Sequence, residues 1–135
     1  MKNLTPSLFT RSALICLLGL FSANSHGIGL GNIEVNSSLN QPLDATIELT
    51  GAVDLTANEL VIRLASVEDF ERMEIPRDYK LTRLKFSSDL TASPPFISVR
   101  SQSPIREPLL VFVLEVQWLK GQMLKEYKLF LNPAP

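Results

Sequence analysis

The chain has 135 residues, of which 45% are hydrophobic and 20% charged, the composition of a single globular domain rather than a disordered or fibrous chain. The formal net charge is −1 and no block of like charges occurs. This charge balance argues against nucleic-acid binding, which needs a basic surface, and against an acidic or basic interaction tail.

The N-terminal segment has the pattern of a secretory signal peptide. Lys2 and Arg11 are its only charged residues, the apolar run Ser12–Phe21 follows them, and small polar residues come next. The alternative is an uncleaved membrane anchor. Crossing a bilayer takes roughly 20 apolar residues, about twice the length of this run. The pattern therefore favours a cleaved signal peptide.

Ala23 and Ser25 fit the −3 and −1 positions of a cleavage site, so we place cleavage after Ser25. The chain then divides into a signal peptide, residues 1–25, and a domain, residues 26–135. Cleavage removes Cys16, the only cysteine, and leaves no thiol for a disulfide or a zinc site. Losing two positive charges from a net charge of −1 leaves −3. We expect a soluble periplasmic protein that contacts the membrane only through its signal peptide before cleavage.

Alternation of apolar and polar residues predicts β-strands along most of the remaining chain, because a strand presents successive side chains to opposite faces. The segments with this pattern are 30–38, 43–49, 59–66, 82–87 and 96–100. Gly29 and Gly31 break the alternation ahead of Ile33 and Val35, which suits a β-bulge or a close approach of two backbones.

One segment favours a helix instead. Ser66 is followed three residues later by Asp69, a weak capping-box pattern. Phe70 and Met73 then recur at helical spacing, and Pro76 is expected to end the run. We predict one or two helical turns that pack Phe70 and Met73 on the edge of a sheet.

The apolar run Leu109–Trp118 begins after Pro108 and ends before a predicted Lys120–Gly121 turn. It is too short to span a membrane and is rich in valine, which favours a central strand covered on both faces at its start and on one face later. The residues expected to face the core are Leu110, Phe112, Leu114, Val116 and Trp118. On the opposite face, Glu115 and Gln117 follow the apolar residues and are expected to lie on the solvent side.

The segment after the turn, residues 122–132, is predicted to run back and complete a β-hairpin. Tyr127 belongs to its core-facing residues. Lys125 interrupts that face near the turn, where we expect solvent.

Together these elements predict an all-β fold: an immunoglobulin-like β-sandwich of about seven strands with one short helix. The disulfide usual in such sandwiches is missing, and Trp118 is expected to supply part of the core in its place.

No residue pattern indicates catalysis, a cofactor or a small-molecule substrate. The chain lacks a Gly-x-Ser-x-Gly elbow, and the cluster Gly27, Gly29 and Gly31 precedes a strand rather than a helix, so no phosphate loop is predicted. His26, the only histidine, would lie at the new N-terminus, where copper binding is the alternative to a frayed end. We expect no metal and no enzyme, with facing carboxylates from distant strands as the open enzymatic alternative.

Arg106 and Glu107 form the one polar stretch that stands out, because they lie between two prolines just before the long strand. A rigid charged loop of this kind can dock a protein partner. The alternative is structural: Arg106 pairs with a nearby carboxylate or caps loop carbonyls, since the polar groups at a proline-fixed strand entry need partners.

Several stretches resemble the N-terminal periplasmic domain of the FimV family of type IV pilus assembly and polar landmark proteins. They are "SLNQPLDA", "RLAS" followed by "EDF", "REP", and the closing pattern W-x-x-G-x-x-L-x-E-Y from Trp118 to Tyr127. The resemblance covers roughly Gly29 to Pro133. Family members continue into a peptidoglycan-binding LysM module, a transmembrane helix and a cytoplasmic region, and no activity of those parts is carried over here.

The resemblance implies an exported, non-catalytic interaction module that serves type IV pilus or cell-envelope assembly, with envelope or pilus-assembly proteins as partners. The alternative is a periplasmic chaperone or adaptor with an immunoglobulin-like fold that lends a strand to its clients, which requires a long exposed edge strand. An exported enzyme or copper-binding protein is the third possibility.

Overall fold

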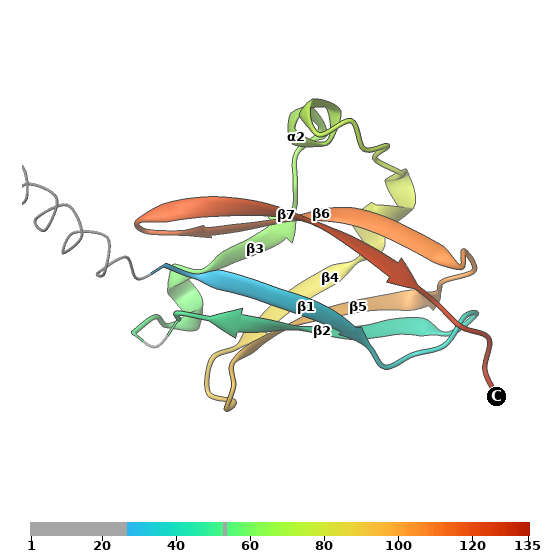
Figure 1. Ribbon diagram of the computed structural model, residues 1–135, viewed down its shortest axis with the longest axis horizontal. Coiled ribbons are helices and arrows are strands. Elements are labelled where there is room, and N and C mark those ends of the chain that lie inside the picture. Colours follow the sequence, from blue (N-terminus) through green and yellow to red (C-terminus); the bar gives the residue numbers. More distant parts are fainter. Residues whose placement is uncertain (1–26, 53) are drawn as a thin grey trace, which may run out of the picture.

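The computed structural model describes residues 27–52 and 54–135, so the predicted signal peptide and His26 lie outside the described residues. Seven strands form two antiparallel sheets that face each other as two layers (Figure 1). The first sheet has the order β1-β2-β5-β4 and the second the order β3-β6-β7. The strands are β1 (Gly29–Val35), β2 (Pro42–Thr50), β3 (Val61–Leu64), β4 (Lys85–Asp89), β5 (Phe96–Pro104), β6 (Leu109–Trp118) and β7 (Gly121–Phe130). The predicted immunoglobulin-like all-β class is confirmed.

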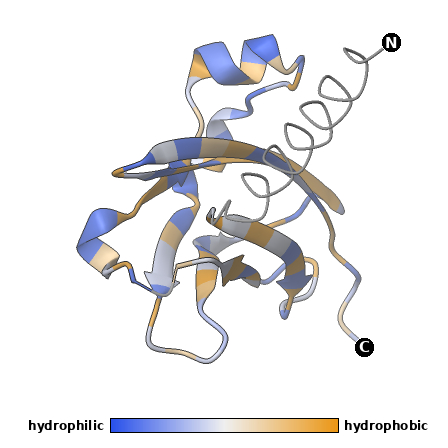
Figure 2. Ribbon diagram, turned by 60° about the vertical axis from the view of Figure 1, so that its left-hand side comes forward, coloured by the Kyte–Doolittle hydropathy of each residue, from blue (hydrophilic) through white to orange (hydrophobic). Residues whose placement is uncertain are grey.

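The core lies between the two sheets, because alternate residues of the long strands point inward. Figure 2 shows this alternation as apolar bands along the strands. The largest buried side chains come from both layers: Leu43, Ile47, Leu49, Ile97 and Val99 from the first, and Phe112, Leu114, Val116 and Leu129 from the second. Tyr127 is also buried, whereas Leu110 and Trp118 are half-buried. The Trp118 ring lies at the hairpin end of the sheet, 3.3 Å from the position that a Cβ on Gly121 would take.

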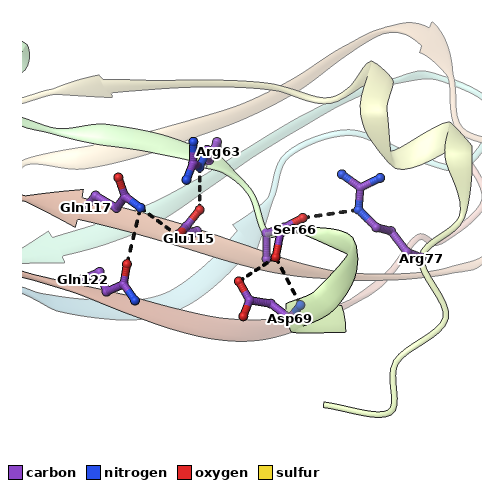
Figure 3. Close-up of polar contacts among 8 residues, drawn as sticks. Arg63, Ser66, Asp69, Arg77, Glu115, Gln117 and Gln122 are labelled. Carbon is purple, nitrogen blue, oxygen red and sulfur yellow. Dashed lines mark hydrogen bonds and ion pairs between the residues drawn. The ribbon is translucent and has the colours of Figure 1, made fainter. Parts of the chain in front are cut away.

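The predicted helix is present as α2 (Val67–Arg72), beside the two 3₁₀ turns η2 (Ala57–Glu59) and η3 (Tyr79–Arg83). The Ser66 hydroxyl accepts a hydrogen bond from the backbone N–H of Asp69, as the capping pattern predicts (Figure 3). Phe70 is buried and Met73 half-buried. The helix ends before Pro76, because Glu74 takes a left-handed backbone conformation with φ 58°.

The strand predicted over residues 82–87 begins later than expected. The chain first forms η3, whose start is fixed by the Asp78 carboxylate accepting the backbone N–H of Lys80. Residues three apart share a side of a 3₁₀ turn, and Leu81 and Leu84 are both buried there. The local turn therefore replaces the first half of the predicted strand.

Burial along β6 is greatest in the middle, not at the start as predicted. Leu109 is 48% exposed, whereas Phe112 to Val116 are all buried. The chain leaving β3 explains the difference: Ala65 donates a backbone hydrogen bond to Val113, and α2 then follows on the outer side of this sheet (Figure 1).

Glu115, in the middle of β6, is also more buried than the sequence predicts. The sequence places it on the solvent side of β6, yet it is only 5% exposed. Arg63 Nε contacts Glu115 Oε2 at 2.5 Å, and Gln117 Nε2 donates to Glu115 Oε1 at 2.9 Å (Figure 3). Both carboxylate oxygens therefore have partners, which a buried charge requires.

Gly31 of β1 lies in a bulge, as predicted, whereas Gly29 is paired with Thr50 ahead of the bulge. The β1–β2 register shifts between Leu30 and Ile33, and a Cβ on Gly31 would lie 3.1 Å from the Cβ of Glu48. The prediction that Lys125 lies near solvent was wrong. Its side chain is half-buried, and its Nζ donates to the carbonyl of Leu30 at 2.9 Å. The bulge turns this carbonyl toward β7, which supplies the donor.

Candidate interaction site

The loop that joins β5 to β6 is held by the backbone on both sides. Ile105 exchanges two backbone hydrogen bonds with the β1–β2 loop, donating to Gln41 at 3.0 Å and accepting from Asn40 at 2.8 Å. Leu131, just after β7, donates to Pro108 at 2.8 Å. These bonds hold the loop that carries Arg106 and Glu107 in a fixed position.

Glu107 has a partner from a distant part of the chain. Lys80 Nζ, in η3, lies 2.6 Å from Glu107 Oε1, and both side chains are about half-exposed. The hydrogen bond from Lys80 lowers the pKa of the Glu107 carboxyl, and the same bond raises the pKa of the Lys80 amine. The pair joins the loop to η3 across 27 residues of sequence.

Arg106 does not take the structural role that was considered for it. Its side chain is exposed, and among the described residues it forms no ion pair and no side-chain hydrogen bond. Two neighbouring residues with the same sequence context therefore differ in the structure: the Glu107 side chain is paired with Lys80, and the Arg106 side chain is exposed to solvent.

A cleft of about 660 Å³ opens beside this loop. We call it the end cleft, because it lies at the end of the sandwich where β6 begins and from which the C-terminal segment leaves (Figure 1). Its apolar lining comes from η3 and the residue after it, from the β5–β6 loop and from the start of β6: Leu81, Leu84, Ile105, Leu109, Leu110 and Val111. Lys80, Arg83, Arg106 and Glu107 also line it.

Exposed apolar side chains extend the surface beyond the end cleft. Leu109 is paired across the hairpin with Phe130, which is 71% exposed. Tyr79, between cleft residues Asp78 and Lys80, is 68% exposed. Aromatic residues and arginine next to an apolar depression are the composition that protein–protein interfaces favour.

Sequence reasoning identified only one side of the end cleft. The η3 side, with Lys80 and Arg83, lies more than 20 residues earlier and carries no motif. Its only sequence signal was Asp78 before Lys80, which predicts a turn but not its neighbours.

A second hollow, of about 610 Å³, lies on the outer face of the first sheet, where Glu34 and Glu48 line it together with Phe96. The two carboxylates come from different strands, β1 and β2, as the open enzymatic alternative requires. Both are exposed, whereas a glycosidase pair needs one carboxyl in a desolvated site. Within residues 27–52 and 54–135, no group of three or more His, Cys, Asp or Glu residues could hold a metal ion.

The chaperone alternative requires a long edge strand, and β7 is one. It has ten residues and lies at the edge of its sheet. Its charged residues weaken this interpretation, because Glu126 and Lys128 pair at 3.7 Å on the outer face and charged side chains discourage edge pairing. Lys125 and Tyr127 also bond to carbonyls of β1, so the inner face of this strand is tied to the other sheet.

In the part of the chain that the structure describes, no helix is both long and apolar enough to cross a membrane. Known proteins give a direct comparison. The chain is 44% identical over 115 residues to the motility hub protein FimV of two Pseudomonas aeruginosa strains, PAO1 and UCBPP-PA14. The match covers 84% of this chain and 12% of those relatives, so the chain spans about an eighth of their length. No solved structure gives a significant match.

The family model for the FimV N-terminal Ig-like domain matches residues 28–134, which is almost the whole described structure. The match includes all seven strands, α2 and every residue of the end cleft. The chain therefore belongs to the FimV N-terminal domain family, as its sequence motifs predicted.

Proposed function

We propose that this chain is an exported, non-catalytic protein-interaction module of the cell envelope, which serves motility or type IV pilus assembly by binding an envelope protein through the end cleft. Family membership supports the motility context. The observation that carries the proposed mode of action is the end cleft itself, an apolar depression beside a loop fixed on both sides. A periplasmic location, reached by cleavage of residues 1–25, is part of the proposal.

The geometry suits recognition better than turnover. A loop fixed by backbone bonds and by the Lys80–Glu107 pair loses little freedom on binding, which lowers the entropic cost of association. The exposed side chains of Tyr79, Leu109 and Phe130 supply apolar contact area around the cleft.

Site-specific photocrosslinking in living cells tests this proposal. A photoreactive residue replaces Tyr79 beside the end cleft, and the matched control replaces Leu119, which is 92% exposed at the tip of the β6–β7 hairpin. The two sites lie at opposite ends of β6, roughly 30 Å apart at about 3.3 Å per residue.

We expect a defined envelope or pilus-assembly protein to be crosslinked from position 79 and not from position 119. Leu109→Asp should abolish that crosslink. Capture of the same proteins from both positions would refute the end cleft as the binding site. Capture of unfolded pilin-like subunits along β7, for example from position 126, would favour the chaperone alternative.

A further inference from the structure

We infer that the partner segment recognised by the end cleft is an apolar peptide that carries carboxylates. The inference rests on the proposed function and adds the chemistry of the ligand. It follows from which charges at the cleft are already engaged and which are not.

Both carboxylates of the end cleft have partners within the chain. The Asp78 carboxylate accepts the backbone N–H of Lys80 at 2.9 Å, and the Glu107 carboxylate contacts Lys80 Nζ at 2.6 Å. Lys80 and Glu107 therefore balance each other's charge, whereas Asp78, which accepts only a neutral backbone N–H, keeps its negative charge.

The two arginines are in the opposite situation. Arg83 and Arg106 line the end cleft, both are exposed, and neither forms an ion pair or a side-chain hydrogen bond among residues 27–52 and 54–135. A guanidinium presents a fixed fork of donors that matches a carboxylate. Besides the balanced Lys80–Glu107 pair, two arginine charges stand against the single charge of Asp78, so the net charge that a ligand meets at this site is positive.

This local charge contrasts with the rest of the domain. The end cleft carries three positive and two negative side chains, on a domain whose net charge without the predicted signal peptide is −3. A net-positive site on a domain of net negative charge favours anionic ligands over cationic ones. The apolar lining adds a second requirement, since a purely acidic ligand would leave Leu81, Ile105 and Leu109 without a contact.

Binding of labelled peptides to the purified full-length protein, followed by fluorescence anisotropy, tests the inference. The probe is a short peptide in which phenylalanine and leucine are flanked by glutamate. Two comparison peptides replace the glutamates by lysine or the apolar residues by serine. The test variant is Arg83→Glu/Arg106→Glu. The control, Arg72→Glu/Lys120→Glu, makes the same change in net charge on α2 and at the hairpin tip.

We expect the acidic apolar peptide to bind, and its affinity to fall with added salt. The test variant should weaken binding about tenfold, which corresponds to about 1.4 kcal/mol, and should gain affinity for the lysine peptide. The control should bind like the parent protein. The variant Arg83→Gln/Arg106→Gln, which creates no repulsion, should lose affinity without gaining any for the lysine peptide.

Three results would overturn the inference. The first is equal weakening of peptide binding by the test and control variants, and the second is binding of the serine peptide as tight as that of the acidic apolar peptide. The third is that no peptide binds and sedimentation shows a second copy of the chain as the occupant of the cleft. Crosslinking from position 79 that survives Arg83→Glu/Arg106→Glu would refute the charge inference alone. Loss of the difference between positions 79 and 119 would refute the proposed function as well.

Discussion

The bond between β7 and the bulge of β1 offers a sharp test of how the two sheets are held together. Tyr127 Oη donates to the Gly31 carbonyl at 2.9 Å, and Lys125 Nζ donates to the Leu30 carbonyl at 2.9 Å. Lys125 also reaches the Gly31 carbonyl at 3.4 Å and lies 5.2 Å from the centre of the Tyr127 ring. Tyr127→Phe removes one donor and keeps the ring, whereas Lys125→Met removes the other and keeps an apolar chain.

The structure sets the size of each effect. Tyr127→Phe loses one neutral hydrogen bond to a half-buried carbonyl, worth about 1 kcal/mol, because the packing of the ring on Phe112 is retained. Lys125→Met loses charge-assisted donation, worth about 2 kcal/mol. The double variant should cost more than the sum of the two, because it leaves the Gly31 carbonyl with neither of its donors.

Urea unfolding followed by the fluorescence of Trp118, the only tryptophan, measures these differences. At a slope of about 1 kcal/mol per molar urea, Tyr127→Phe should lower the midpoint by about 1 M. Lys128→Met is the control, since Lys128 is exposed on the outer face of the same strand. Additive losses in the double variant, or an equal loss in the control, would refute the shared role of Lys125 and Tyr127.

Three further predictions concern stability. Burial raises the pKa of Tyr127 to about 12, so below pH 10 the phenol is neutral in both the folded and the unfolded state. As pH rises from about 10 to 12, the phenol ionises first in the unfolded state, which lowers the free energy of unfolding. Urea titration at each pH should show a fall about 2 kcal/mol larger than in Tyr127→Phe. Phe70→Ala should cost about 3–5 kcal/mol in thermal or urea unfolding because the ring is buried, and a loss below 1 kcal/mol would show that α2 is not part of the core. Glu74→Gly should raise stability by about 0.5 kcal/mol by relieving the positive φ, whereas Glu71→Gly inside the helix should lower it by about 1 kcal/mol; melting temperatures that move together would contradict this reading of the helix end.

Strand positions followed from local pattern, because a strand with one buried face must alternate. The limits of β6 agree with the apolar run, and the Ser66–Asp69 cap placed α2 correctly. Departures occurred where a short local motif outweighed the alternation. The Asp78 cap formed η3 in place of the start of a strand, and the left-handed Glu74 ended α2 before Pro76.

The candidate site was predictable only in part. Arg106 and Glu107 stood out because two prolines flank them, but among the residues that the structure describes Glu107 has a partner and Arg106 does not, and that difference depends on Lys80. Glu115 and Lys125 were both expected near solvent, and both are covered by partners from other strands.

The amino-acid sequence alone determined the class of fold, the approximate strands and the family, and it predicted an export signal. Each of these depends on residues close together in the chain. The tertiary structure alone decided which charged groups are paired and where an apolar hollow opens. Pairing energy depends on distance in space and on exclusion of water, and neither can be read from spacing along a chain whose partners lie 27 or more residues apart.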